Sequence, residues 1–580
     1  MKTIFSLIAG LWLIIAVLSC GEELSEIAPV SPPGVILGQY NEATKSVGGR
    51  ITAEGDGIVE FGHIWLTSPN RPTSLSQGDT ARASALIGVD SFYTIIDLVD
   101  TTAQHYVWAY VKDVHDQPRF SDNHIVINPD NSNNPVAGFD VPPGPFKAPA
   151  TLTFTSTSLR ADELEWYVDD ELIATNNQEF TYVFEKPGNY AVKLVAIGDG
   201  GVDDAITKTV AIEWNTYSKT ETNYGEAIKI LPLQNGDYLI LAKKTTGSNT
   251  DIVLIKMGIF GNIKDTQTYD YSNSDTPSDM ALLSDGALAI VGTTFNTTAN
   301  NEDVLYIRVN INDLEVLNKR LLSANNNAGN DNGNCVMEFE GKVFIAGSTK
   351  LTGDDYDIFI ALGPFGMKDG SPVSFEIAPV AIDLPNNEIA HSTILSNDGH
   401  MLIAGQSRTT GNTTWDAMLL KLSPSAGAAV PASGYPKTWG STIDNDYAYG
   451  ISQLSDNSFL MVGTTSYNGG TTNDINLMKL SASGTPLWSN LGMINDSDFD
   501  YGYGILPLND GAFLVLGSSN DNALMMKRNN NNNLIWKEYY GSSGIDHFNS
   551  ATVTPDGGFL AVGKQGGALL ITKTDDSGKQ

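Results

Sequence analysis

Acidic residues recur at a fixed distance before a series of turns in the C-terminal part of this 580-residue chain. Eleven positions before the turn residue that anchors each unit stand Gly225, Asp275, Asn330, Glu388, Asp446, Asp500 and Asp546. We interpret the first unit as two residues longer than the others, so Asn223 is the expected equivalent there. Crowded carboxylates repel one another unless a cation or hydrogen-bond donors compensate them. Asp275, Glu388, Asp446, Asp500 and Asp546 are therefore candidate ligands of Ca²⁺ or of a cationic group. The alternative is that each one caps its own turn by accepting backbone N–H bonds.

A second acidic set stands at the start of a later strand in each of the first five units. Its members are Asp251, Asp303, Asp357, Asp416 and Asp474. If the units are repeats of one β-structure, the two sets lie at the same end of it.

Other catalytic or metal-binding patterns are missing from the sequence. The seven His form no ligand pair and are expected mostly in solvated loops. Two Cys exclude a disulfide framework and a Cys-ligated zinc site, and we expect Cys335 in a core. No Gly-x-Ser-x-Gly elbow occurs. The sequence 496–500 begins like a calcium loop, but Tyr501 and Pro507 stand where an EF-hand needs Gly and Glu. We therefore predict no enzyme and no resident cofactor, with Ca²⁺ as the one open possibility.

The N-terminal residues predict a lipid anchor. Lys2 precedes an apolar run over 4–18, which is too short to be a typical membrane span. Val17-Leu-Ser-Cys20 resembles the lipobox of bacterial lipoproteins, which implies a signal peptide over 1–19 and lipidation of Cys20. The next residues, Gly21-Glu-Glu23, resemble those of surface-exposed outer-membrane lipoproteins. Residues 20–34 are expected to form an acidic, Pro-rich tether.

Composition limits the fold and the partners. The chain has 34 Lys and Arg against 67 Asp and Glu, so its net charge of −33 excludes a nucleic-acid partner. With 56 Gly and 25 Pro, turn-rich all-β structure is expected.

Two β-sandwich modules are predicted before the repeats. In residues 35–131, Phe61-Gly-His-Ile-Trp65 and the later Tyr106-Val-Trp-Ala-Tyr110 resemble the central strand and the Tyr corner of fibronectin type III domains. In residues 135–213, Glu165-Trp-Tyr-Val-Asp169 and the stretch Tyr182 to Tyr190 resemble a PKD domain with Trp166 in its core.

Residues 214–580 contain one repeat seven times. A turn such as Asp285-Gly286 precedes an apolar strand, and six positions after the turn glycine stands a second Gly, with Ala242 as the exception in the first unit. The pattern resembles the DGGF-type propellers of bacterial surface proteins, which implies a seven-bladed β-propeller; eight blades remain the alternative. The last unit lacks a fourth strand, so residues near Trp214 are expected to supply it.

Together these patterns predict a lipid-anchored, surface-exposed binding protein with an extracellular protein or polysaccharide as its partner. The alternatives are a propeller enzyme acting on extracellular polysaccharide and a purely structural scaffold. The ligand and the oligomeric state are not predicted.

Overall fold

The computed structural model describes residues 32–580 with internal gaps. The gaps are 42–43, 56, 88–89, 97, 99–103, 128–133, 199–202, 273, 325–328, 351–354, 410, 426–427, 468–471, 489–493, 495–498 and 543. The predicted signal peptide, Cys20 and most of the predicted tether lie outside the described residues. In the described part the chain is all-β, as predicted, with one 3₁₀ turn at Leu75–Gln77. No helix in that part is long and apolar enough to cross a membrane.

The chain divides into two compact units, and the first begins with two small sheets. One sheet has the order β1 (Gly34–Asn41), β2 (Ser46–Ala53), β5 (Ser91–Ile95). The other has the order β4 (Asp79–Arg82), β3 (Ile58–Leu66), β6 (His105–Asp113), β7 (Pro118–Phe120), with β8 (Ile125–Ile127) also paired to β6. Side chains of both sheets share one core, which contains Trp65 as predicted.

A second pair of sheets follows in the first unit. One has the order β10 (Phe146–Lys147), β16 (Asp203–Glu213), β15 (Gly188–Ile197), β12 (Glu163–Val168), β13 (Glu171–Thr175). The other has the order β14 (Glu179–Phe184), β11 (Ala150–Ser156), β9 (Phe139–Asp140). Trp166 is fully buried, as predicted, and its ring contacts those of Phe139 and Phe180.

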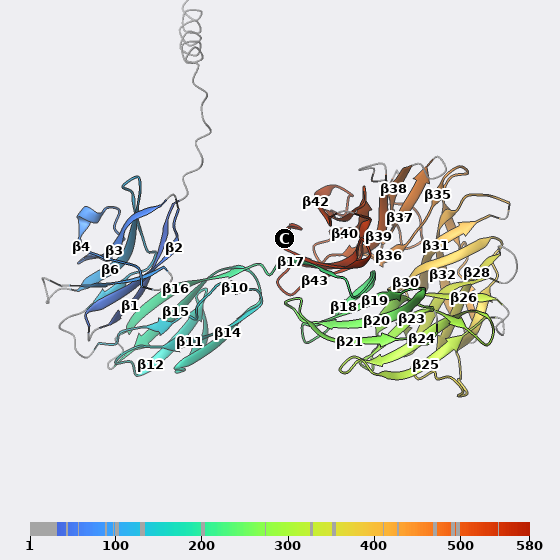
Figure 1. The fold of residues 1–580 in the computed structure, drawn as a ribbon, viewed down its shortest axis with the longest axis horizontal. Coiled ribbons are helices and arrows are strands. Elements are labelled where there is room, and N and C mark those ends of the chain that lie inside the picture. Colours follow the sequence, from blue (N-terminus) through green and yellow to red (C-terminus); the bar gives the residue numbers. More distant parts are fainter. Residues whose placement is uncertain are drawn as a thin grey trace, which may run out of the picture. The chain divides into compact units, whose positions relative to one another are not determined.

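The second unit consists of seven antiparallel sheets, numbered here in chain order (Figure 1). Sheet 1 contains β18 (Ala227–Pro232), β19 (Tyr238–Thr246), β20 (Asn249–Met257) and β21 (Ile263–Tyr269). Sheet 2 contains β22 (Asp275–Leu282), β23 (Ala287–Asn296), β24 (Asn301–Asn310) and β25 (Val316–Leu322). Sheet 3 contains β26 (Asn330–Phe339), β27 (Lys342–Lys350), β28 (Tyr356–Gly363) and β29 (Ile377–Ile382).

Sheets 4 to 7 continue the same order of strands. Sheet 4 contains β30 (Asn387–Leu395), β31 (Met401–Arg408), β32 (Asp416–Ser425), β33 (Ala428–Pro431) and β34 (Lys437–Trp439). Sheet 5 contains β35 (Asn445–Asp446), β36 (Gly450–Gln453), β37 (Phe459–Tyr467) and β38 (Thr472–Leu480). Sheet 6 contains β39 (Asp500–Pro507), β40 (Phe513–Ser519), β41 (Asn522–Arg528) and β42 (Leu534–Tyr540). Sheet 7 contains β43 (Asp546–Val553), β44 (Phe559–Gln565) and β45 (Ala568–Thr574).

The outer strand of sheet 7 comes from the start of the region, as predicted. Strand β17 (Tyr217–Glu221) pairs antiparallel with β45, with Tyr217 opposite Lys573. Figure 1 shows β17, coloured green, beside the red strands of this sheet. The pairing joins residues more than 350 positions apart and covers the edge of β45.

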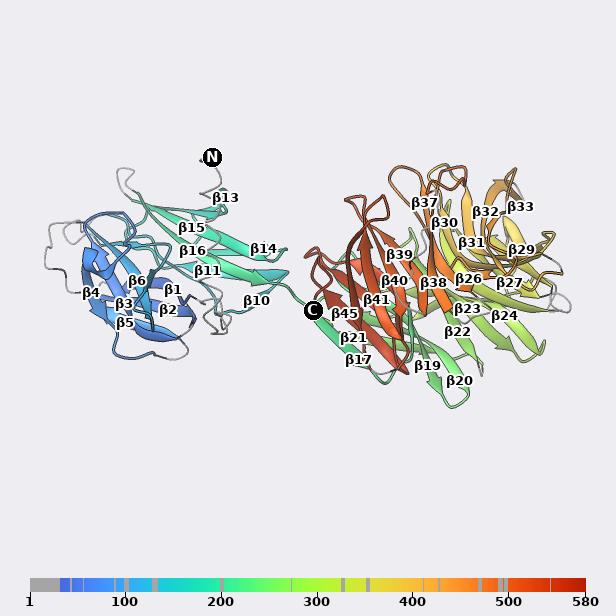
Figure 2. The ribbon, with the colours of Figure 1, turned by 90° about the horizontal axis from the view of Figure 1, so that it is seen from above.

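Neighbouring sheets are held together by apolar cores. Each core joins two consecutive sheets, and one further core joins sheet 7 to sheet 1 through residues such as Ile240 and Val562. The first strands of successive sheets also contact one another, and β18 contacts β43. Figure 2 shows the sheets in chain order from green to red.

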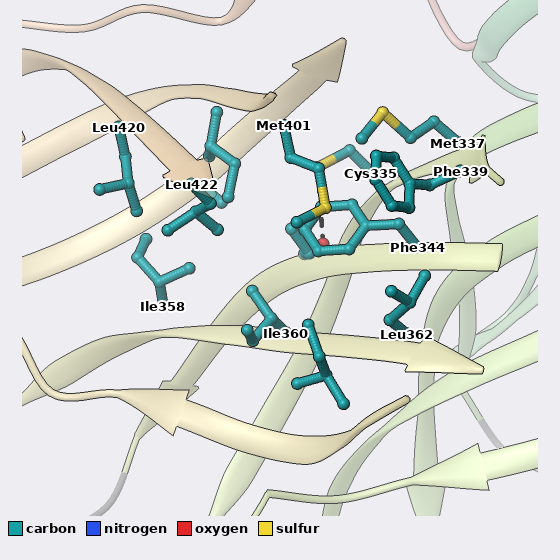
Figure 3. Close-up of a cluster of buried hydrophobic side chains, with 14 of the residues drawn as sticks. Cys335, Met337, Phe339, Phe344, Ile358, Ile360, Leu362, Met401, Leu420 and Leu422 are labelled. Atoms are coloured by element: carbon teal, nitrogen blue, oxygen red, sulfur yellow. Dashed lines mark hydrogen bonds between the residues drawn. The ribbon is translucent and has the colours of Figure 1, made fainter. Parts of the chain in front are cut away.

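The core between sheets 3 and 4 contains Cys335. Its thiol is 1% exposed and lies near Phe344 and Met401 (Figure 3). Burial raises the pKa of this thiol, which keeps it protonated at neutral pH. Cys335 is therefore a core residue, as predicted.

The repeated glycine of the second strand has a steric cause. In sheets 2 to 7, a Cβ at this glycine would lie 1.8–2.2 Å from a carbonyl oxygen of the adjacent first strand. In Gly563, for example, the nearest atom would be the carbonyl oxygen of His547. The first strand bulges at this place, between Phe548 and Ser550 in sheet 7. The regular glycine spacing in the sequence is therefore caused by a close approach of the first and second strands, which leaves no room for a Cβ.

Candidate functional site

The strand pairing fixes which residues are equivalent at the start of the first strands. The acid stands opposite a residue two positions after the repeated glycine, as Asp275 does opposite Thr294. By this register the equivalent in sheet 3 is Asp331, opposite Thr349, and not Asn330. In the first sheet the pairing of the first strand begins at Ala227, opposite Ala242, and the N–H of Gly225 donates to the carbonyl oxygen of Lys243, so the assignment of Asn223 stays a prediction.

The error in sheet 3 has a local cause. The turn between β26 and β27 has only two residues, Glu340 and Gly341, with φ of 47° and 71°. The corresponding turn of sheet 2 spans Leu283 to Ala287. Counting eleven positions back from the turn glycine therefore reaches Asn330 in sheet 3, one residue before the true equivalent, Asp331. With Asp331 included, all six sheets from 2 to 7 carry a buried acid at this position.

Most of these acids accept hydrogen bonds from the loop that enters their strand. Asp275 Oδ2 accepts the N–H groups of Tyr271 and Ser272 at 2.6 and 2.9 Å. Asp546 Oδ2 accepts the N–H of Ser542 at 2.8 Å. Asp446 Oδ2 accepts the N–H of Ser441 at 3.3 Å. Asp500 is fully buried at the same register. This geometry is that of loop capping.

Glu388 is compensated less fully than the aspartates. Its Oε1 accepts the Ser407 hydroxyl at 3.1 Å, but its buried Oε2 has no hydrogen-bond partner. Burial and the nearby carboxylates of Asp357 and Asp355 raise the pKa of Glu388 to about 8. The side chain is therefore largely protonated at neutral pH.

No three of the five predicted metal ligands lie within 4.8 Å of one another in the described part of the chain, and their role as ligands stays a prediction. Among the described residues, the close carboxylate triad is Asp251, Asp270 and Asp275, which contains a single member of the predicted set. The triad joins the third strand of sheet 1 to the first strand of sheet 2, so the two acidic sets lie at the same end of the sheets.

A second group of side chains, missed by the sequence analysis, lines the first strands of sheets 4 to 7. We call it the aromatic wall: His391, Tyr447, Tyr449, Tyr501, Tyr503 and His547. Tyr449 bridges two sheets, with its ring centroid 5.1 Å from that of His391 and 6.0 Å from that of Tyr503. Tyr503 lies 5.1 Å from His547. Within one strand, Tyr501 and Tyr503 are stacked with 4° between their planes.

The aromatic wall ends in a polar cluster. His547 Nε2 lies 2.9 Å from Glu226 Oε1, and Asn549 Nδ2 donates to the same oxygen at 2.8 Å. Lys243 Nζ lies 2.6 Å from Glu226 Oε2. Although burial opposes it, hydrogen bonds from His547 and Lys243 hold the pKa of Glu226 far below its usual range. Glu226 is therefore a fixed negative charge beside the tyrosines.

Residues two positions apart share one side of a strand, which places the paired side chains of the wall together. The residues just before and at the bulge, such as Tyr501 and Tyr503, flank a residue packed against the neighbouring sheet. The four tyrosines and His391 are partly exposed, whereas His547 is 8% exposed. A wall of this kind offers aromatic faces, hydroxyls and amides to a ligand.

The sequence contained a signal for this group. Asp446-Tyr-Ala-Tyr449, Asp500-Tyr-Gly-Tyr503 and Asp546-His-Phe-Asn549 share one spacing after the strand-start acid. The expectation that most His lie in solvated loops is wrong for several. His63 is fully buried, with Nε2 2.9 Å from the carbonyl oxygen of Gly48, and His105 and His547 are also buried.

Comparison with known proteins identifies one module. Residues 137–211 match the PKD domain family, as predicted for that region. A search of curated proteins found no match to the chain.

Solved structures give weak likenesses only. The polysaccharide lyase Uly1 is 10% identical with a TM-score of 0.38, covering 62% of this chain and 99% of that one. Sqt1 from Chaetomium thermophilum is 9% identical with a TM-score of 0.35, covering 62% and 100%. A glucose dehydrogenase is 11% identical with a TM-score of 0.32, covering 51% and 96%. At these scores the likenesses carry no argument about this chain.

Proposed function

We propose that this protein is a lipid-anchored, surface-exposed binding protein whose aromatic wall holds an extracellular glycan. The single observation that carries the proposal is the continuous contact of aromatic rings from His391 through Tyr449 and Tyr503 to His547, ending at Glu226.

In this proposal the seven sheets are the blades of a seven-bladed β-propeller. Three features support it. Seven sheets follow one another along the chain, and an apolar core lies between each pair of neighbouring sheets. Sheet 7 also shares a core with sheet 1, and their first strands β43 and β18 are in contact. The aromatic wall then faces the central channel, because its residues stand on the first strands of blades 4 to 7 and first strands line the channel. A ring closed by β17 holds these strands in fixed positions.

The chemistry of the wall favours a neutral sugar chain. Tyrosine rings present apolar faces that pack against the C–H face of a pyranose, while their hydroxyls serve the sugar hydroxyls. Asn549 and Gln406 add amide groups at the edge, and Gln406 Oε1 lies 3.0 Å from His391 Nε2. The net charge of −33 and the ionised Glu226 disfavour an anionic ligand.

The alternative function is an enzyme that cleaves extracellular polysaccharide. The observation that favours it is the short contact between His547 and Glu226 beside Tyr503, because such a group can transfer protons. Glu226 is also held by Lys243 and Asn549, which makes it a structural anion in our account.

An array of neutral and acidic polysaccharides tests both functions. The full-length protein is applied to the array, and reducing ends and unsaturated sugars are assayed in parallel. We expect retention on neutral glycans without new ends. Product formation would establish the enzyme, and an array without any retained glycan would contradict the glycan proposal.

The anchor is a separate part of the proposal. Two sandwich modules, a fibronectin type III-like one over 35–131 and a PKD domain over 135–213, serve as the stalk between the tether and a propeller over 214–580. Cys20→Ser should block acylation and release the protein from the membrane fraction. Incorporation of labelled palmitate into this variant would contradict the lipobox assignment.

A further inference from the structure

A hydroxyl-bearing residue stands between two acids in four of the sheets with a buried strand-start acid, sheets 2 to 5. In sheet 2, Thr294 lies opposite Asp275 on the first strand and Asp303 on the third. Thr349 of sheet 3 stands in the same way between Asp331 and Asp357. Directly opposed residues of antiparallel strands point to the same face, so the three side chains of each row are neighbours. Sheets 4 and 5 repeat the arrangement, and their members are Glu388, Ser407 and Asp416, and Asp446, Thr465 and Asp474.

In sheets 2, 4 and 5 the hydroxyl donates to the acid of the first strand. Thr294 Oγ1 donates to Asp275 Oδ1, and Ser407 Oγ donates to Glu388 Oε1 at 3.1 Å. Thr465 Oγ1 donates to Asp446 Oδ1 at 2.5 Å. The hydrogen bond compensates one carboxylate oxygen in each case.

Sheet 3 breaks this pattern. Thr349 and Asp331 are both fully buried. Neither Thr349 Oγ1 nor Asp331 Oδ1 has a hydrogen-bond partner. The neighbouring Asp303 of sheet 2 is 1% exposed, and its Oδ1 also has no partner. The second carboxylate oxygen of each aspartate accepts a hydrogen bond. Asp331 Oδ2 accepts one from the Ser323 hydroxyl at 2.6 Å, and Asp303 Oδ2 accepts one from the Asn296 amide at 2.5 Å.

We propose that Asp303 Oδ1, Asp331 Oδ1 and Thr349 Oγ1 are protein ligands of a Ca²⁺ ion at the junction of sheets 2 and 3. An oxygen that is buried without a donor is costly. Asp331 and Thr349 are directly opposed, and the Asp331 carboxylate acts on that of Asp303, so a single cation could compensate all three oxygens. Ca²⁺ suits the set because it takes six to eight oxygen ligands in flexible geometry, including water.

The two carboxylates are electrostatically coupled. Burial raises the pKa of Asp303, and the carboxylate of Asp331 raises it further. A cation between the two carboxylates would compensate this repulsion and favour the ionised form of Asp303. The site is distinct from the aromatic wall, and its existence does not depend on the proposed glycan.

The triad Asp251, Asp270 and Asp275 is a weaker site for a cation. Both oxygens of Asp275 accept hydrogen bonds, from Thr294 and from two backbone N–H groups. Asp270 is exposed. Donors rather than a metal therefore compensate Asp275, and Oδ1 of the other buried member, Asp251, accepts the Asn249 amide at 2.9 Å.

Calorimetric titration of the EDTA-stripped, full-length protein with CaCl₂ tests the site, with thermal melts in EDTA and in Ca²⁺. The variants are Thr349→Val and Asp331→Asn. Thr294→Val is the matched control, because it removes the equivalent hydroxyl of sheet 2, which already has an acceptor. Binding to the folded state raises the melting temperature by mass action.

We expect saturable heat for the wild type, affinity at least tenfold weaker in Thr349→Val, and no binding in Asp331→Asn. Without metal, Thr349→Val should melt no lower than the wild type, whereas Thr294→Val should melt lower and still bind Ca²⁺. Absence of heat up to about 10 mM Ca²⁺, which exceeds the range of extracellular calcium modules, would overturn the proposal. Equal affinity of the wild type and Thr349→Val would overturn it as well.

Discussion

Glu388 shows how burial sets the charge of a single residue. Its pKa of about 8 lies well above the value of 4.5 for an exposed Glu. Between pH 4.5 and pH 8, Glu388 binds more protons in the folded protein than in the unfolded chain. The free energy of unfolding therefore falls as pH rises from 4.5 to 8, and the contribution is fully lost above pH 8.

Glu388→Gln should remove this pH dependence. Glutamine keeps an acceptor for Ser407 and carries no charge, so the variant should be more stable than the wild type by about 1–4 kcal/mol at pH 8.5. Near pH 4.5 the two proteins should be nearly equal. Urea unfolding in EDTA at both values measures the difference. A difference that does not change with pH would show that Glu388 is not protonated in the folded state.

At the scale of the strand, the repeated glycine allows a second prediction. A Cβ at Gly563 would lie 1.9 Å from the carbonyl oxygen of His547. Gly563→Ala should lower the free energy of unfolding by about 1–3 kcal/mol, because the two backbones must separate. The control is Gly567→Ala in the same sheet, where an added Cβ meets no atom within 4 Å. Equal melting temperatures for the two variants would contradict the steric role of Gly563.

The strands of the second unit could be predicted from the sequence where their residue pattern recurs from one sheet to the next. Glycine spacing and turn residues recur in the sequence because backbone contact demands them, and they predicted the repeated β-units and the strand added by β17. Asp331 was missed because one hairpin has a shorter turn, which moves the register without changing the residue pattern. The aromatic wall was missed because its residues stand on only four of the seven sheets, whereas the sequence prediction rests on residues that recur along the whole series of units.

At the scale of the whole molecule, β17 should decide the stability of the second unit. Removal of residues 1–221 takes this strand away and exposes β45, whose side chains are all buried. Removal of 1–213 keeps the strand. We expect a lower melting temperature and more aggregation for the shorter chain, because an open edge strand pairs with other chains. Thermal melts and light scattering compare the two chains. Identical behaviour would contradict the closure.

The glycan site is the central claim, and calorimetric titration with a glycan retained on the array tests it most directly. The proteins are the wild type, the double variant Tyr449→Ala/Tyr503→Ala and the control Tyr539→Ala, whose tyrosine is 46% exposed on outer strand β42. Loss of two central aromatic contacts should weaken binding by about 30-fold or more. The control should bind like the wild type. Unchanged affinity in the double variant would contradict the account and place the ligand elsewhere on the molecule.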